Sequence, residues 1–455
     1  MNATMSALHS NRWVRAAALA VVVGVVLSGC SKTEILDADT PDVITPDNLT
    51  SPEGQAALFA GAVSDMVVSA SSAGGGVIIW SGLFTDEFKH ASTPPAVREW
   101  DLRALLSTNS VAVGQPAGAA PGGPFIATQR ARAALEYAAS VLPSGDGRAG
   151  EALALAGLAY IHLGEMWCSG VPISNRETGE TGPPQSTAQL FDTAIERLNS
   201  AAATTGGDAR INNLIAVLRG RTLLNQGQFA QAAAAVANVP TSYEYQFIHG
   251  NPPARQTNQI WLQNASDIYS VSDKEGTNGL DFGSANDPRV PVSAPALSRN
   301  DAVTQHQYFL KYNGQNNPIV MASGIEARLI EAEAALQGSD VTGWLNKLNE
   351  ARSSSVAPAG LAPLTDPGTQ TARENLMFRE RAFWMYLTGH RLGDLRRMIK
   401  QYGRAKESVF PTGAYHKQGL TYGQDRAAPQ AAFIVPQPEE NNSNFDPSAC
   451  DPTLP

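Results

Sequence analysis

The chain has 455 residues, 43% of them hydrophobic, and this length and composition predict a globular protein with a large core. Its 33 lysines and arginines are outnumbered by 42 aspartates and glutamates, which gives a formal net charge of −9. Because no long basic run interrupts this acidic balance, the composition disfavours nucleic-acid binding.

The first 29 residues have the organisation of a secretory signal peptide. Arg12 and Arg15 form a basic start, and the apolar run at 16–27 is too short to be a comfortable permanent membrane helix. The run ends in LSGC, residues 27–30, which resembles the lipobox of bacterial lipoproteins. The resemblance implies that Cys30 becomes the first mature residue and carries a diacylglycerol and a third acyl chain, such as palmitate. Several acyl chains anchor a protein durably, whereas one binds only marginally.

Residues 30–54 are polar and contain three prolines, which predicts a lipidated tether leading into one domain at 55–455. Ser31 and Lys32 follow the cysteine where an aspartate would retain the protein at the inner membrane, by resemblance to enterobacterial sorting. We therefore expect a lipid-anchored protein of the outer membrane, exposed at the cell surface.

The domain is predicted to be mainly helical. A helical period covers 55–69, an irregular segment follows at 77–124, and helices are expected at 125–142, 151–167 and 187–203. Residues 211–240 predict a further hairpin that turns at Gly227. Stacked hairpins of this kind resemble degenerate tetratricopeptide repeats, so we expect an α-α superhelix.

Residues 240–320 lose the helical period and gain Gly, Asn, Pro and Tyr. A segment of this length is too long for a bare connector, which predicts a loop-rich insertion that forms a functional surface. Helices are expected again at 325–336, 344–352 and 371–399, and the rest of the chain reads as irregular.

Cys168 and Cys450 are the two cysteines that remain once Cys30 is lipidated. In an oxidising compartment they can form a disulfide that ties the carboxyl-terminal tail to the helical body. Two unpaired thiols stay open as an alternative, because spacing along the chain does not show the distance between them. No histidines neighbour these cysteines to complete a zinc site, and we expect no metal and no other cofactor.

The stretch FRERAFWMYLTGHRLGDLRRM, residues 378–398, contains five arginines and one histidine. On a continuous helix His390, Arg391 and Asp394 would share one face. A metal site or a proton relay would need a further ligand, and none is evident nearby. We interpret the stretch as a buried scaffold helix whose charges pair with neighbouring helices.

Four segments in this order resemble the SusD/RagB family of outer-membrane nutrient-binding lipoproteins. They are the lipobox with its tether, AGLAYIHLGEMWCSGVPIS at 156–174, VMASGIEARLIEAEAALQG at 320–338, and the arginine-rich stretch. In that stretch the matching positions are Glu380-Arg381, Gly389-His390-Arg391 and Asp394-Leu395-Arg396-Arg397. FIVPQPEENNSN at 433–444 is similar to the closing segment of the family.

The resemblance implies a helical scaffold with a loop-rich ligand-binding face and no catalytic activity. It also implies that the protein captures oligosaccharides, or peptides, and delivers them to a partner SusC-like TonB-dependent transporter.

Aromatic side chains in the irregular segments are the candidates for ligand contact, because a sugar ring stacks on Trp or Tyr while polar groups bind its hydroxyls. These candidates are Trp80, Trp100, Tyr243 and Tyr245, with Asp86 as a partner for hydroxyl groups. Each aromatic could instead pack in the core, and Asp86 could instead cap a helix.

Two other functions stay open. A surface glycoside hydrolase would need two carboxylates across a cleft, and no motif marks such a pair. A lipid-anchored repeat scaffold that binds only proteins also fits the helices.

Overall fold

The computed structural model describes residues 49–71, 76–114, 123–175, 178–250, 256–417, 419–424, 426 and 428–455. Its contacts divide the chain into two units, Met1–Gly54 and Gln55–Pro455. In the first unit, Ser51 Oγ accepts a hydrogen bond from the Gly54 amide at 3.0 Å. The expected signal peptide and Cys30 lie outside the described residues.

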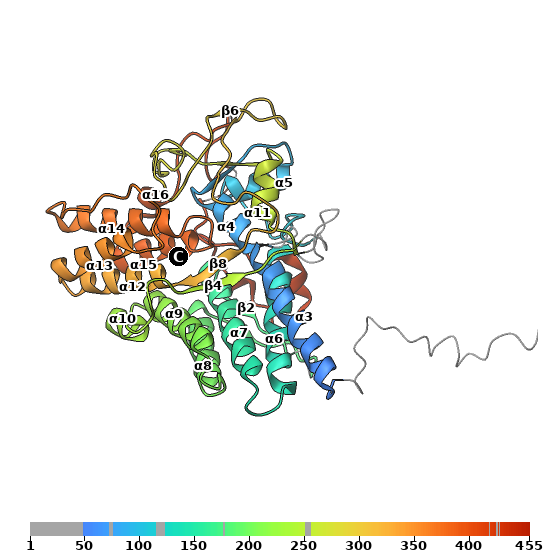
Figure 1. Ribbon diagram of the computed structural model, residues 1–455. Helices are drawn as coiled ribbons and strands as arrows, with labels where there is room; N and C mark the ends of the chain where they lie inside the picture. Colours follow the sequence, from blue (N-terminus) through green and yellow to red (C-terminus); the bar gives the residue numbers. More distant parts are fainter. Residues whose placement is uncertain are drawn as a thin grey trace, which may run out of the picture. The chain divides into compact units, whose positions relative to one another are not determined.

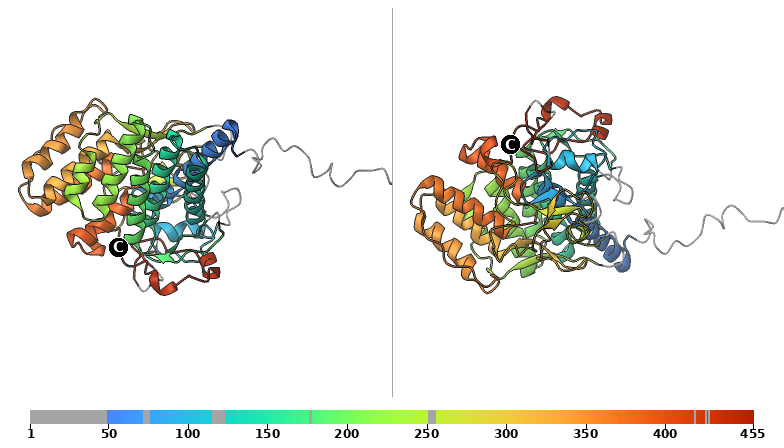
Figure 2. Two further views of the ribbon diagram at one scale, coloured as in Figure 1. Left: turned by 90° about the horizontal axis from the view of Figure 1, so that it is seen from below. Right: turned by 90° about the horizontal axis from the view of Figure 1, so that it is seen from above.

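Antiparallel helical hairpins build most of the second unit, so the predicted mainly α fold is confirmed (Figure 1). The helices of this array are α6 (Gly123–Val141), α7 (Gly147–Met166), α8 (Thr187–Ala202), α9 (Ala209–Asn225), α10 (Phe229–Val236), α12 (Gly324–Gln337) and α13 (Val341–Ser353). Each packs on the next, with α10 packing directly on α12. Figure 2 shows the same helices side by side from below.

Side-chain caps determine where several of these helices begin. Asp146 accepts a hydrogen bond from the Arg148 amide at the start of α7, and Ser186 forms a capping box with Gln189 at the start of α8. Such caps satisfy amides that have no partner within the helix, and each typically stabilises a helix by about 1 kcal/mol.

Small residues let α7 and α8 approach closely. A Cβ atom added at Gly164 would lie 2.7 Å from the Phe191 ring, and one added at Gly157 would lie 3.0 Å from Leu198. Gly157 and Gly164 are therefore packing residues, each facing an apolar side chain of α8.

Three helices precede this array in the sequence: α3 (Pro52–Ser71), most of which belongs to the second unit, α4 (Val77–Phe84) and α5 (Pro95–Asp101). Two of these, α4 and α5, form where the sequence predicts an irregular segment. Every residue of α4 is buried, so the helix has no polar face and shows no amphipathic period. The helix α5 begins at Pro95. Proline suits the first position of a helix, because the backbone N–H that it lacks would have no partner within the helix.

The strands are short and form four antiparallel pairs within the described residues. The pairs are β1 (Phe88–His90) with β5 (Tyr269–Val271), β2 (Val171–Pro172) with β3 (Pro184–Gln185), β4 (Glu244–Phe247) with β8 (Ile319–Ser323), and β6 (Ala296–Leu297) with β7 (Gln305–His306).

The pair of β4 and β8 shows how the loop-rich insertion joins the helical array. The two strands flank the insertion in sequence, and β8 leads directly into α12. Residues 248–318 therefore leave and re-enter the array at one place, and they contain the short helix α11 (Gln259–Ala265).

The arginine-rich stretch is two helices and not the single helix predicted over 371–399. These are α14 (Gln370–Trp384) and α15 (Arg391–Tyr402). Between them Leu387 has φ 54° and Gly389 has φ 81°, in the left-handed region that ends a helix. The Leu387 amide donates a hydrogen bond to Glu87 Oε1 at 2.9 Å, so a tertiary contact holds the break.

The carboxyl-terminal tail contains α16 (Lys406–Val409) and two 3₁₀ turns, η3 (Gln437–Asn441) and η4 (Pro447–Ala449). Cys450 follows η4 and is joined to Cys168 by a disulfide with a Cα–Cα distance of 5.1 Å. The bridge ties the tail to the segment just after α7, in the way that the sequence allowed.

Among the described residues, no helix combines the length and the apolar character that crossing a membrane requires.

Candidate functional site

The buried charges of the arginine-rich stretch lie in the core and not on a binding surface. Arg391 makes two hydrogen bonds to the Asp86 carboxylate, at 2.6 and 2.7 Å, and both side chains are buried. Asp86 therefore joins α15 to the end of α4. This corrects the interpretation of Asp86 as a partner for ligand hydroxyls, because both of its oxygens are occupied inside the protein.

A second buried cluster links α14 and α15 to α12. Asp394 accepts hydrogen bonds from Arg381 and Arg397, and Arg397 also pairs with Glu333 on α12. Burial alone would raise the pKa of Asp394, but the two arginines hold it well below its usual range. The interpretation of this stretch as a scaffold whose charges pair with neighbouring helices is confirmed.

His390 does not share a site with Asp394. Its Nε2 lies 3.2 Å from Glu326 Oε1 on α12, and Glu326 also accepts a hydrogen bond from Arg221 at 2.6 Å. Among the residues that the structure describes, no group of three or more His, Cys, Asp or Glu side chains is arranged to hold a metal ion.

The tryptophan candidates for ligand contact lie in the core. Trp80 and Trp100 are only 4% and 1% exposed, and their ring centroids are 5.0 Å apart. Phe433 packs edge-on against Trp100 at 4.7 Å. The expectation that these rings face a ligand is corrected, because their faces are covered by other aromatic side chains.

The two tyrosine candidates on the SYEYQ segment differ in exposure. Tyr245 is 4% exposed and its hydroxyl donates a hydrogen bond to Glu151 at 2.6 Å, so it is a core residue and that candidate is also corrected. Tyr243 is half-buried and donates a hydrogen bond to the Arg210 carbonyl at 2.7 Å. A contact between Tyr243 and a ligand stays a prediction.

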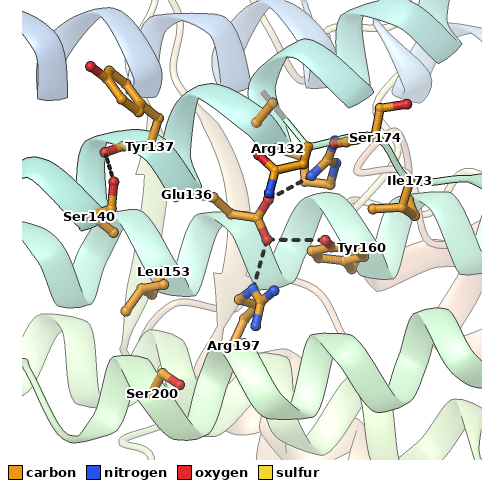
Figure 3. A pocket seen from close by; sticks show the side chains of 13 residues that line it. Arg132, Glu136, Tyr137, Ser140, Leu153, Tyr160, Ile173, Ser174, Arg197 and Ser200 are labelled. Carbon is orange, nitrogen blue, oxygen red and sulfur yellow. Dashed lines mark hydrogen bonds and ion pairs between the residues drawn. The ribbon is translucent and has the colours of Figure 1, made fainter. Parts of the chain in front are cut away.

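A polar recess with a volume of about 450 Å³ lies between α6, α7 and α8, beside the segment that follows β2 (Figure 3). We call it the α6–α8 recess. Its volume falls in the range of about 300–1,000 Å³ that is typical of small-molecule sites. None of the candidates from the sequence lines it. The side chains that define its chemistry are Arg132, Glu136, Tyr137, Ser140, Tyr160, Asn175, Arg197 and Ser200.

Glu136 is the central group of the recess. Its Oε1 accepts hydrogen bonds from Arg197 Nε at 2.7 Å and from the Tyr160 hydroxyl at 3.1 Å, and its Oε2 accepts one from Arg132 Nη1 at 2.6 Å. These bonds join three helices around one carboxylate, as Figure 3 shows. Glu136 is therefore preorganised as a support for two guanidinium groups.

Arg132 and Arg197 differ in how completely they are bound. Arg132 is buried, and it also donates hydrogen bonds to the Gln129 side chain and the Ser174 carbonyl. Arg197 has a side chain that is 28% exposed at the recess. Arg132 is thus a structural part of the wall, whereas Arg197 can contact a bound molecule.

A larger recess of about 700 Å³ lies between α8, α9 and α10. Small and amide-bearing side chains make up much of its lining, and Gln226 donates a hydrogen bond to its carboxylate, Asp192, at 2.8 Å. We take the α6–α8 recess as the candidate site because it combines a preorganised charged network with hydroxyl groups and an aromatic ring at its edge.

One signal for this site was present in the sequence. Arg132 and Glu136 are four residues apart in a predicted helix, a spacing that favours an ion pair. Tyr160 and Arg197 come from two further helices, and their approach to Glu136 depends on how the hairpins stack.

No protein-family model matches the chain, and no curated protein matches it. Solved structures match it over most of its length. A SusD superfamily protein from Parabacteroides distasonis has a TM-score of 0.62 and 13% identity, and the match covers 87% of this chain and 98% of that chain. Surface glycan-binding protein A from Bacteroides thetaiotaomicron has a TM-score of 0.60 and 13% identity, covering 85% of this chain and 96% of that one.

A SusD-like carbohydrate binding protein from Bacteroides vulgatus has a TM-score of 0.55 and 15% identity, with 75% of this chain and 82% of that chain covered. The three matches agree on one architecture, and the sequence resemblance pointed to the same one. The chain therefore has the SusD-like fold.

Proposed function

We propose that this protein is a divergent SusD/RagB-type lipoprotein that captures oligosaccharides at the outer surface of the outer membrane and delivers them to a TonB-dependent transporter. The observation that carries the proposal is the fold, which matches 82% of a protein described as carbohydrate-binding and 96% of one described as glycan-binding.

The chemistry of the α6–α8 recess supports binding more than hydrolysis. Its lining presents hydroxyl, amide and guanidinium groups, which are suited to hydrogen bonds with sugar hydroxyls. Glu136 is the one carboxylate among the lining residues that the structure describes, and it is engaged by both arginines. A glycoside hydrolase would need a second carboxylate across the site.

Ligand capture is tested with purified protein against a panel of oligosaccharides and peptides by isothermal titration calorimetry. We expect binding of an oligosaccharide and no change in its chain length after prolonged incubation. Release of shorter sugars would favour a hydrolase. Binding of peptides alone, or of neither class, would overturn oligosaccharide capture.

The partner and the anchor need separate tests in the native organism. We expect a TonB-dependent transporter to be encoded beside the gene and to co-purify with the protein. We also expect a clickable palmitate analogue to label the wild-type chain, and not the Cys30→Ala variant. The absence of such a transporter would argue against delivery, and an unlabelled wild-type chain would argue against lipid anchoring.

A further inference from the structure

We infer that the α6–α8 recess selects oligosaccharides that carry a carboxylate group, with Arg197 as the residue that binds it. This inference rests on the proposed function and adds the chemical class of the ligand. It starts from the charge of the recess, where the lining residues that the structure describes include two arginines and one glutamate. Among these lining side chains the positive charges outnumber the negative one, in a chain whose formal net charge is −9.

The contacts of Arg197 leave the two terminal nitrogens of its guanidinium available to a ligand. Its Nε is bonded to Glu136, which fixes the plane of the guanidinium, while Nη1 and Nη2 make no hydrogen bond among the described residues. The second acidic neighbour, Glu196, lies 3.4 Å from Nη1, and its own side chain is 70% exposed. A ligand carboxylate can displace so loose a partner and accept two parallel bonds from the terminal nitrogens.

Two other features keep Arg197 in place for this role. The buried ring of Tyr160 lies between the guanidinium groups, with Arg132 at 5.8 Å and Arg197 at 5.9 Å from its centroid. Glu136 holds Arg197 through Nε and is shared with Arg132, so its single negative charge does not neutralise both guanidinium groups. The guanidinium of Arg197 is therefore held in position before a ligand arrives.

A hydroxyl group beside Arg197 suits the rest of an acidic sugar. Ser200 Oγ donates to the Glu196 carbonyl, so its oxygen presents lone pairs that can accept from a sugar hydroxyl. A charged donor holds a carboxylate more strongly than it holds a neutral acceptor. This difference in binding strength makes the recess prefer acidic to neutral oligosaccharides.

The test measures the binding of acidic sugars and their neutral counterparts to the purified full-length chain by isothermal titration calorimetry. The probes are trigalacturonic acid, a glucuronic-acid disaccharide and the methyl ester of each, in which esterification removes the negative charge. We expect at least one acid to bind about ten- to hundredfold more tightly than its ester, the effect of charged hydrogen bonds. This advantage should shrink as the salt concentration rises.

Three variants assign the effect to Arg197. Arg197→Gln should remove the preference, so that the acid and its ester bind with similar affinity, whereas Arg197→Lys should keep part of the preference because it retains the charge without the two parallel donors. Arg148→Gln is the matched control, since Arg148 lies outside the recess and pairs with Asp146 at the start of α7. Unchanged circular dichroism and melting temperature would show that the variants are folded.

Each outcome decides the matter. Equal binding of acids and esters, or a preference that survives Arg197→Gln, overturns the inference and leaves oligosaccharide capture standing. If these probes fail but neutral oligosaccharides bind, the inference again fails alone. If only peptides bind through Arg197, or no oligosaccharide of either kind binds, both the inference and the proposed function fail.

Discussion

Individual buried ion pairs determine which distant segments of this fold lie together, although each intact pair adds little to the free energy of unfolding. The pair of Asp86 and Arg391 joins the turn that follows α4 to α15, across a sequence separation of 305 residues. An intact buried pair adds little to stability, because the loss of hydration offsets the attraction between the charges. Removing one partner is different, since it leaves the other charge buried and unpaired.

Asp86→Asn should therefore lower the free energy of unfolding by about 3–5 kcal/mol, because Arg391 would lose its carboxylate while it stays buried. Chemical denaturation followed by circular dichroism measures the change. Asp366→Asn is the control, because Asp366 and Arg373 form an ion pair nearer the surface and its loss should have little effect. Equal effects of the two substitutions would contradict the assigned role of Asp86.

Between elements, close backbone approach determines how the insertion returns to the helical array. Gly324 is the first residue of α12, and its amide donates a hydrogen bond to the Tyr243 carbonyl. A Cβ atom at this position would lie 1.9 Å from the Pro240 carbonyl oxygen. Since the obstacle is backbone and not a flexible side chain, the chain has no easy way to make room.

Gly324→Ala should therefore destabilise the protein by about 1–3 kcal/mol or more through overpacking at this junction. The measurement is again the free energy of unfolding. Gly61→Ala in α3 is the matched control, because no atom lies within 4 Å of the added Cβ and alanine favours a helix. A neutral result at Gly324 would mean that the junction is more open than described.

The disulfide is the other connection between distant elements, because Cys168 and Cys450 are separated by 282 residues. Replacing both with serine should lower stability by about 2–5 kcal/mol, since the closed loop restricts the unfolded chain. Thermal unfolding of the double variant, compared with wild type under non-reducing conditions, measures this. A melting temperature unchanged by the substitution would argue against a stabilising bridge.

For the whole molecule, buried titratable groups determine the pH range in which the fold is most stable. Burial lowers the pKa values of His90 and His162 to about 3, so the unfolded chain binds protons more readily below pH 6.5. Burial raises the pKa of Glu87 to about 8 and that of Glu165 to about 7, so the folded chain holds protons there that the unfolded chain releases.

The signs of these shifts predict stability that is highest at mildly acidic pH. The histidine contribution is present above pH 6.5 and is lost as the pH falls towards 3, whereas the glutamate contribution is present below pH 4.5 and is lost as the pH rises towards 8. We expect a maximum between about pH 4.5 and 6.5 and a decline on either side. Denaturation midpoints measured from pH 3 to 8 test this.

Glu87→Gln provides the control for the alkaline side of the profile. Glutamine resembles the neutral acid, so the decline between about pH 6.5 and 8 should become shallower. Lys311 interacts electrostatically with Glu87, and burial lowers the pKa of Lys311 to about 8. The slopes of the wild type and of Glu87→Gln are therefore compared below that pH. An unchanged slope would mean that Glu87 is not the group whose ionisation destabilises the fold.

Much of the array was predictable because helix formation and hairpin pairing depend on local patterns. The apolar periods of α8 and α9 are visible in the sequence, and so is the order of the segments that resemble the SusD family. The helix α4 escaped prediction because burial on all sides leaves no period to read.

The sequence by itself determined the helical hairpins and the loop-rich insertion, since each depends on patterns within a short length of chain. It also indicated that the arginine-rich stretch pairs its charges internally, but the partners Asp86, Glu326 and Glu333 come from distant segments. Only the tertiary structure decided which side chains line a recess. It placed Trp80 and Trp100 in the core, and it brought Glu136, Tyr160 and Arg197 together from three helices. Burial and long-range hydrogen bonding arise when distant segments pack, and no local pattern encodes that packing.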